Sequence, residues 1–167
     1  MDYDISLASS VNVDDISALL QANAPSQGGS LTGEFPPDKV RKMIIGGMPV
    51  VVARREGRVV GVLFSAATDA PAPPVVRAML DAWSGGSGSY VYGPVCIADT
   101  ERGRGLLPQL CAVLKKRLPG REAILFIRTD NIASIRAHER LGMREVARFF
   151  FESSDFVVFS SDADGVG

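Results

Sequence analysis

The spacing of apolar residues in the first half of the chain predicts both strands and helices. Ile16, Leu19 and Leu20 recur at helical spacing, and the β-branched runs on either side of Glu56-Gly57 are typical of a hairpin. The expected elements are a strand over 4–8, a helix capped by Asn12 or Asp14, a second helix from Pro37, and strands over 48–54 and 58–66.

Beyond residue 89 the pattern becomes a regular succession of strand and helix. Strands are expected over 90–97, 123–128, 144–152 and 156–160, and helices over 106–118 and 131–141. The last strand is expected to close the sheet, and the tail over 161–167 to be frayed. An antiparallel half followed by alternating strands and helices predicts an α/β fold with a mixed sheet. The length of 167 residues suits a single domain over 1–167.

Composition and charge argue against several classes of protein, including nucleic-acid-binding and membrane-spanning proteins. The chain has 18 Lys plus Arg against 19 Asp plus Glu, so it lacks the broad basic field of a nucleic-acid-binding protein. The first residues, MDYDISLASS, do not resemble a signal peptide, and no apolar run is long enough to cross a bilayer. Cys96 and Cys111 lack metal-ligand spacing, although a disulfide between them stays open. We expect a soluble cytoplasmic protein without nucleic acid, membrane or metal partners.

Two glycines mark the junction between the strand over 90–97 and the helix over 106–118. Gly103 and Gly105 permit backbone conformations that are closed to other residues. The first amides of a helix lack intrahelical acceptors, and the helix dipole favours an anion beside them. Arg102 and Arg104 add positive charge. The loop suits a diphosphate, although a solvated turn explains the same residues, and neither the Walker nor the dinucleotide glycine motif is matched.

A second group of polar residues follows about thirty positions later. Asn131, Ser134 and His138 fall on one narrow stripe of the helix expected over 131–141. Each residue also has an ordinary explanation. Asn131 suits a helix cap, Ser134 is common near a helix start, and a lone histidine on a half-buried face is most often structural.

Together the two motifs resemble those of the GCN5-related N-acetyltransferase (GNAT) superfamily. The family's first motif, R/Q-x-x-G-x-G/A after a strand, is represented by Arg102, Gly105 and Leu107. The second motif is approximated by Asn131, Ser134 and His138, followed by Leu141, Gly142 and Met143. The strong resemblance covers residues 90–146, and the earlier elements follow the family's order.

The resemblance implies an enzyme that transfers an acetyl group from acetyl-CoA to an amine by direct attack in a ternary complex, without a metal. In this family the fourth and fifth strands separate, and the pantetheine arm lies in the gap. The implied contacts are Val95, Cys96 and Ile97 with the arm, Arg102, Gly103, Arg104, Gly105, Leu106 and Leu107 with the pyrophosphate, and Asn131, Ser134 and His138 along the arm and near the sulfur. A main-chain amide of the first group would polarise the thioester carbonyl.

Two positions depart from the family pattern. Leu107 stands where Gly or Ala is usual and crowds the helix start, and His138 stands where many members have Tyr. His138 is the candidate general acid for the leaving thiolate. Because imidazole titrates at about 6.5 and tyrosine at about 10, the alkaline limb of the pH profile should begin lower than in a Tyr enzyme. Glu34 is a candidate general base, although a solvated carboxylate is the simpler interpretation, and Cys96 is typical of a core thiol.

The segment over 69–89 is an insertion relative to the simple hairpin that often joins the third and fourth strands in this family. It contains a predicted short helix with Met79 and Trp83 on one face. We hypothesise that this face covers the acceptor cleft or contacts a second copy in a homodimer; a surface helix packed on its own sheet is the alternative. A catalytically quiet CoA-binding module and a nucleotide-binding α/β domain stay open as rival functions. The sequence does not identify the amine.

Overall fold

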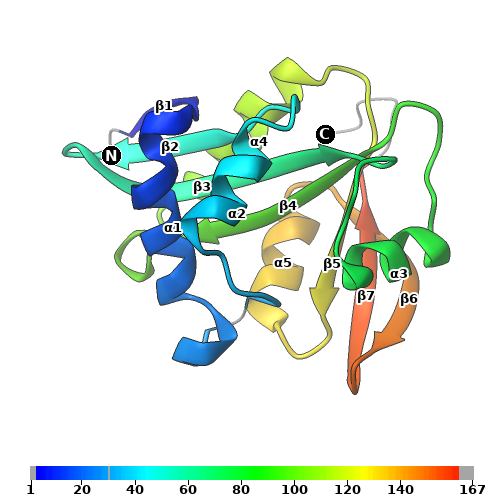
Figure 1. Cartoon of the computed structure of the whole chain (residues 1–167). Coiled ribbons are helices and arrows are strands. Elements are labelled where there is room, and N and C mark those ends of the chain that lie inside the picture. Colours follow the sequence, from blue (N-terminus) through cyan, green and yellow to red (C-terminus); the bar gives the residue numbers. More distant parts are fainter. Residues whose placement is uncertain (1–2, 30, 162–167) are drawn as a thin grey trace. The chain divides into compact units, whose positions relative to one another are not determined.

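The computed structural model describes residues 3–29 and 31–161, and its elements follow the predicted order (Figure 1). The strands are β1 (Asp4–Leu7), β2 (Val51–Arg55), β3 (Arg58–Ala67), β4 (Tyr90–Ile97), β5 (Ala123–Arg128), β6 (Arg144–Phe151) and β7 (Ser154–Ser160). The helices are α1 (Val13–Ala22), α2 (Pro37–Ile44), α3 (Pro74–Ala82), α4 (Leu106–Arg117) and α5 (Ile132–Arg140), with 3₁₀ turns at Ser10–Asn12, Pro25–Gln27 and Asp99–Glu101. No helix among the described residues is both long and apolar enough to cross a membrane.

The seven strands hydrogen-bond in the order β1-β2-β3-β4-β5-β7-β6. The β4–β5 pair is parallel, whereas the β1–β2, β2–β3, β5–β7 and β6–β7 pairs are antiparallel. This order confirms the predicted α/β fold with a mixed sheet.

The prediction that the last strand closes the sheet is wrong, because β7 lies between β5 and β6. Glu152 and Ser153 adopt positive φ angles of 47° and 68° and turn the chain back as a hairpin. Five consecutive residues of β7 are buried, whereas every position of β6 is half-buried or exposed. The more deeply buried strand, β7, thus takes the interior place, and β6 forms the edge.

The end of the described chain is tied to β5. The backbone N–H of Ser161 donates to the Ala123 carbonyl at 3.1 Å, and the Ala123 N–H donates to the Ser161 hydroxyl at 2.8 Å. The rest of the predicted frayed tail, residues 162–167, lies outside the described residues.

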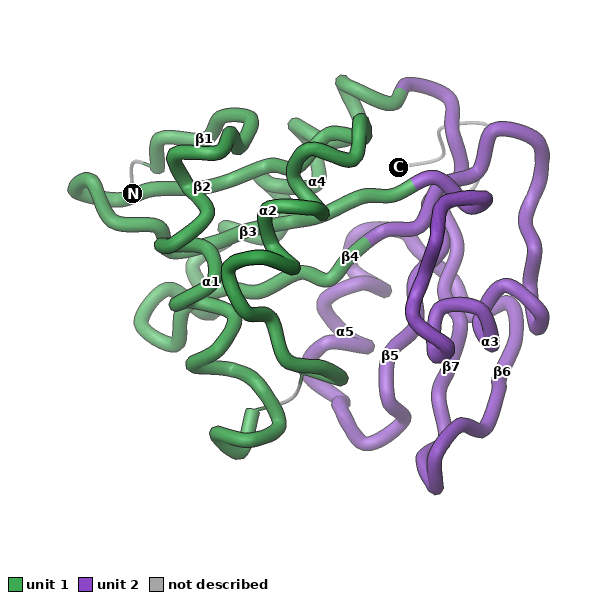
Figure 2. The backbone as a smooth tube through the Cα atoms, in the orientation of Figure 1, with its two compact units in different colours: residues 1–66, 93–118 green, residues 67–92, 119–167 purple. Residues whose placement is uncertain are grey.

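The chain divides into two compact units (Figure 2), one of residues 1–66 and 93–118 and the other of residues 67–92 and 119–167. In the first unit, apolar side chains cover both faces of the strands. Val52 and Val62, which face each other across β2 and β3, pack with residues of α1 and α2. On the opposite face, helix α4 contacts β1 and β2. A single domain over 1–167 stays a prediction.

Helix α4 buries Leu106 rather than Leu107 in its first turn. Leu106 is 1% exposed, whereas Leu107 is only half-buried. The Leu106 side chain lies against Gly61 of β3, where an added Cβ would come within 3.0 Å of Leu106 Cδ2. The absence of a side chain at Gly61 thus lets the first turn of α4 approach the sheet.

The second unit contains the short helix that the sequence predicts within 69–89. Helix α3 contacts β5 and β6, and Met79 is completely buried. Trp83, just after the helix, donates from Nε1 to Glu122 Oε2 at 2.9 Å. This packing agrees with a surface helix on its own sheet, and a role in covering an acceptor or in dimerisation stays a prediction.

A buried carboxylate joins this segment to the sheet. Glu122 accepts hydrogen bonds from Trp83, from the Gly86 N–H at 2.9 Å, from the Ser89 hydroxyl at 3.2 Å and from the Ser160 hydroxyl. Burial alone would raise the pKa of Glu122, but these hydrogen bonds outweigh burial and lower it. The charged carboxylate is therefore the form that the fold stabilises.

Substituting Glu122→Gln is expected to reduce the free energy of unfolding by about 1–3 kcal/mol, because the amide NH₂ would face donors that need an acceptor. Urea denaturation near neutral pH measures the loss. The matched control is Glu139→Gln on the exposed side of α5, where a change within about 0.5 kcal/mol is expected.

The same pair of proteins gives a pH test. A lowered folded pKa contributes stability above the unfolded carboxyl pKa of about 4.3, and that contribution is lost as the pH falls through the folded pKa. The gap between wild type and Glu122→Gln should therefore narrow in acid. A gap that stays constant across this range would contradict the assignment of the stabilisation to the Glu122 charge.

Candidate functional site

The glycine loop lies in the first unit, between the 3₁₀ turn after β4 and the start of α4. Gly103 and Gly105 have φ angles of 74° and 79°, a left-handed conformation that residues with a Cβ rarely adopt. A Cβ added at either glycine would meet no atom within 4 Å. Glycine is thus required by the backbone at both positions, and the space beside them is open.

Helix α4 begins at this loop without a side-chain cap. Its N-cap is Gly105, which has no side chain that could accept from the first amides. Leu106 anchors the first turn in the core, and Pro108, which lacks an N–H, stands within that turn. The backbone therefore offers amide donors and the positive end of a helix dipole at an open surface, which suits an anion.

Arg102, predicted to add charge beside this loop, is held by neighbours in the same unit. Its guanidinium donates to the Ile97 carbonyl at 3.2 Å and to Asn23 Oδ1 at 2.7 Å, and it forms an ion pair with Asp99 at 2.9 Å. These contacts fix the side chain along the loop and compensate part of its charge. Arg104 is exposed on the same loop.

A buried acidic residue, Glu101, anchors the 3₁₀ turn that directly precedes the loop. Glu101 is 4% exposed; it accepts from the Tyr3 hydroxyl at 2.7 Å and pairs with Arg55 at 3.1 Å. The Tyr3 hydrogen bond, followed by those from Arg55, lowers the pKa of Glu101 against the effect of burial. Sequence reasoning missed this residue, because its partners lie 98 and 46 positions away.

The residues expected to contact the pantetheine arm are at the end of β4. Cys96 is buried among the side chains of α1 and α2, and burial raises the pKa of its thiol to about 11. The thiol therefore stays protonated and cannot act as a ready nucleophile. Val95 and Ile97 are half-buried, and the Ile97 carbonyl accepts from Arg102.

The polar residues of α5 form a connected series of hydrogen bonds in the second unit. Asn131 caps the helix, with its Oδ1 accepting from the Ser134 N–H at 3.3 Å. The Ser134 carbonyl lies 2.8 Å from His138 Nδ1. The other ring nitrogen, Nε2, lies 3.0 Å from the hydroxyl of Tyr92 on β4. The predicted stripe is therefore continuous in space, and it ends on a tyrosine that sequence reasoning did not select.

These contacts select one tautomer of the neutral His138 ring. A carbonyl oxygen only accepts, so Nδ1 carries the proton and donates to Ser134. Burial lowers the pKa of His138, and the hydrogen bond to the Ser134 carbonyl acts against this effect. The residue is 2% exposed. In the neutral ring Nε2 is an acceptor, and the Tyr92 hydroxyl donates to it. The role of His138 as a general acid stays a prediction.

Glu34, the candidate general base, is an exposed carboxylate in the first unit. It accepts from the Ser26 hydroxyl at 2.7 Å, the Ser26 N–H at 3.3 Å and Gln21 at 3.4 Å. The Ser26 hydroxyl is the main reason that the pKa of Glu34 is lowered, which weakens it as a base. These contacts organise the loop between α1 and α2, and a catalytic role stays a prediction.

The predicted site residues divide between the two units. The first unit holds Glu34, Val95, Cys96, Ile97 and the loop over 102–107, and the second holds Asn131, Ser134 and His138. Within the described ranges, no three His, Cys, Asp or Glu side chains gather as metal ligands.

Solved structures of similar fold span almost the whole chain. An N-acetyltransferase from Staphylococcus aureus Mu50 covers 98% of this chain and 99% of its own, at 16% identity and a TM-score of 0.71. A Salmonella typhimurium protein, solved with its cofactor acetyl-CoA, covers 100% and 97%, at 19% identity and a TM-score of 0.72. A GNAT-family acetyltransferase from Streptococcus pneumoniae covers 96% and 98%, at 12% identity and a TM-score of 0.70.

The sequence itself matches no family model and no curated protein. The structural likeness is therefore a likeness of fold, and it agrees with the motifs over 90–146 that predicted it. The chain has the fold of the GNAT acetyltransferases.

Proposed function

We propose that the chain transfers the acetyl group of acetyl-CoA to an amine. The observation that carries this proposal is the open glycine loop at the start of α4. There Gly103 and Gly105 hold left-handed conformations, and nothing lies within 4 Å of where their side chains would be. The fold, shared with acetyltransferases of which one relative was solved with acetyl-CoA, supports the same function.

The loop residues fit the diphosphate of CoA. Amides over 103–107 would donate to its oxygens, and the dipole of the 12-residue helix α4 would stabilise its charge. CoA supplies the acetyl group as a thioester. In the reaction, a bond forms from the amine nitrogen to the acetyl carbon and the bond from that carbon to sulfur breaks. The amine loses one proton and the leaving thiolate gains one.

The Tyr92–His138 pair suits the second of these proton transfers. In this tautomer the Tyr92 hydroxyl is the donor to Nε2 of His138, so the hydroxyl holds the proton of this contact and Nε2 has none to give. Tyr92 is 5% exposed, so its hydroxyl is shielded from bulk water. We propose that Tyr92 gives its hydroxyl proton to the leaving thiolate. His138 would orient this hydroxyl, and the Ser134 carbonyl holds the His138 ring in place.

An assay of thiol release from acetyl-CoA against pooled primary amines tests the activity. The proposal expects release that depends on both the protein and an amine, with an acetylated amine detected by mass spectrometry. Saturable acetyl-CoA binding without amine-dependent release across a broad panel would contradict transfer. That outcome would favour the catalytically quiet CoA-binding module instead.

A further inference from the structure

The side chain of Arg102 joins three separate parts of the first unit just before the glycine loop. Its Nε donates to the Ile97 carbonyl at the end of β4 at 3.2 Å, and its Nη2 donates to Asn23 Oδ1 at 2.7 Å. Its Nη1 lies 2.9 Å from Asp99 Oδ1 in the 3₁₀ turn. Each of the three guanidinium nitrogens therefore already has a protein partner, and together these partners span β4, the turn and the end of α1.

Asn23, the C-cap of α1, is a fixed acceptor for this guanidinium. Its Nδ2 donates to the Leu19 carbonyl at 3.0 Å, which turns Oδ1 toward Arg102. Its main-chain carbonyl accepts from the Leu31 N–H at 3.2 Å. The Asp99 side chain, in contrast, is 82% exposed. Because exposed ion pairs contribute little, we take Asn23 as the main anchor of Arg102.

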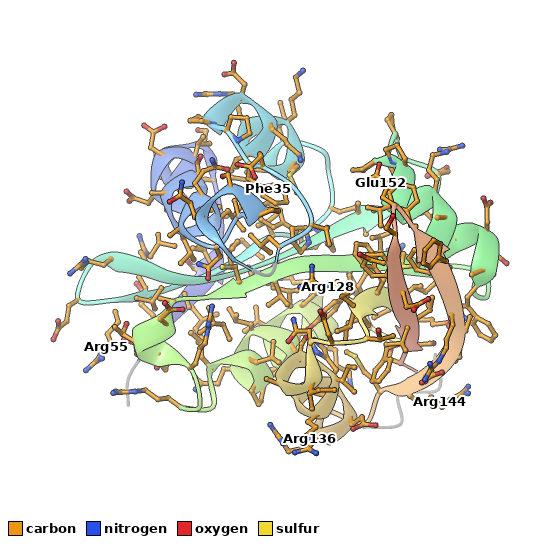
Figure 3. All side chains as sticks on the ribbon, turned by 90° about the horizontal axis from the view of Figure 1, so that it is seen from below. Phe35, Arg55, Arg128, Arg136, Arg144 and Glu152 are labelled. Atoms are coloured by element: carbon orange, nitrogen blue, oxygen red, sulfur yellow. The ribbon has the colours of Figure 1, made fainter. Side chains whose placement is uncertain are left out.

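The 3₁₀ turn before Arg102 is held by other contacts. Figure 3 shows the labelled Arg55 of β2 beside this turn, where Arg55 pairs with the buried Glu101 at 3.1 Å. The Tyr3 hydroxyl donates to the same carboxylate at 2.7 Å. The turn therefore has anchors of its own, and the contacts of Arg102 act on the course of the chain after it.

The glycine loop depends on its ends for a fixed shape. Gly103 and Gly105 adopt left-handed conformations, but glycine reaches many others at little cost, so fixing the loop costs conformational entropy. At one end Leu106 is buried in the core, and at the other the Arg102 side chain ties the chain to Asn23. Amides that are already held in place bind an anion with a smaller entropic loss than amides that must first be ordered.

We propose that Arg102 is a positioning residue of the CoA site. Through its hydrogen bond to Asn23 it holds the amides over 103–107 where they receive the diphosphate, and its guanidinium does not itself bind the phosphates. The inference rests on the proposed function, under which CoA is the ligand. It differs from the contact with the pyrophosphate that the family resemblance implies for Arg102. Asn23, which belongs to neither motif, thereby becomes a residue on which CoA affinity depends.

Isothermal titration of the whole chain with CoA tests this role in matched variants. Arg102→Gln removes the charge, whereas Arg102→Lys keeps it but lacks the planar fork that reaches several acceptors at once. We expect both to bind CoA about tenfold more weakly than the wild type, and Asn23→Ala about fivefold more weakly. The double variant Asn23→Ala/Arg102→Gln should lose no more than about tenfold, because the two residues act through one contact.

Arg117→Gln is the control for the loss of charge. It removes a guanidinium at the other end of α4, about 16 Å along the helix from Leu106, and should change CoA affinity less than about twofold. A thermal melt of each variant, expected within a few degrees of the wild type, excludes loss of folding as the cause.

Two results of the titration would overturn the positioning role. Wild-type affinity in Arg102→Lys beside a weakened Arg102→Gln would show that the positive charge itself binds the phosphates. Wild-type affinity in Asn23→Ala would show that the contact between Asn23 and Arg102 does not serve CoA binding.

NMR order parameters of the amides over 103–107 give a second measurement, which needs no CoA. In Asn23→Ala we expect them to fall from about 0.85, typical of rigid backbone, toward about 0.6, and in Arg117→Gln to stay unchanged. Unchanged order in Asn23→Ala would also overturn the positioning role. If the wild type bound no CoA, the proposed function would fail, whereas the order parameters would still decide whether Arg102 and Asn23 hold the loop.

Discussion

A chain carrying Gly105→Asp is expected to bind CoA at least about 100-fold more weakly than the wild type. The new carboxylate would stand at the N-cap of α4, where the proposed diphosphate needs amide donors, and the two negative charges would repel. The side chain has room, since nothing lies within 4 Å of its Cβ position. Isothermal titration with CoA measures the effect.

Gly105→Asn is the matched control, because asparagine has nearly the same size and tolerates left-handed conformations about as well as aspartate. It adds no charge, and we expect it to lose no more than about tenfold in affinity. Both variants should melt within a few degrees of each other. Equal losses of CoA affinity in Asp and Asn variants would show that no anion binds at this helix start.

Tyr92→Phe is expected to lower kcat for amine acetylation by about 100-fold while leaving CoA affinity nearly unchanged. The change removes the hydroxyl that donates to His138 Nε2 and that we assign to the leaving thiolate. Steady-state kinetics with a good amine acceptor, together with a CoA titration, separate the two quantities. A Tyr92→Phe enzyme with wild-type kcat would remove Tyr92 from the chemistry.

Two substitutions at His138 then decide what the imidazole does. His138→Gln keeps an acceptor for the Tyr92 hydroxyl but removes the titrating ring, so a positioning role predicts a loss of less than about tenfold. His138→Phe removes the acceptor and should approach the loss of Tyr92→Phe. If His138→Gln loses as much as His138→Phe, the proton comes from the imidazole and the positioning role is wrong.

The fold was largely predictable, because most elements have a clear local pattern. The bounds of β4 and β5 agree with the sequence prediction to the residue, and the Glu56-Gly57 turn joins β2 to β3 as expected. The position of β7 was not predictable in this way. Strand order depends on which of two neighbouring strands buries more surface, and spacing along a single strand does not measure that difference.

The candidate site was predictable where its signals are local. The glycines before α4 and the stripe of α5 follow from backbone conformation and helical period. Partners that are distant in sequence were missed: Asn23 holds Arg102 from 79 positions away, and Tyr92 contacts His138 from 46 positions away. The tautomer of His138 and its lowered pKa could not be predicted from the sequence either, because they depend on burial and on the contact with the Ser134 carbonyl.

The central claim is that the start of α4 binds the diphosphate of CoA, and one competition titration tests it most directly. CoA, ATP and NAD are each titrated into the whole chain under identical salt, and ATP and NAD are then used to displace bound CoA. We predict saturable CoA binding at least about tenfold tighter than that of either nucleotide. No measurable CoA binding, or binding of ATP or NAD as tight as that of CoA, would contradict it.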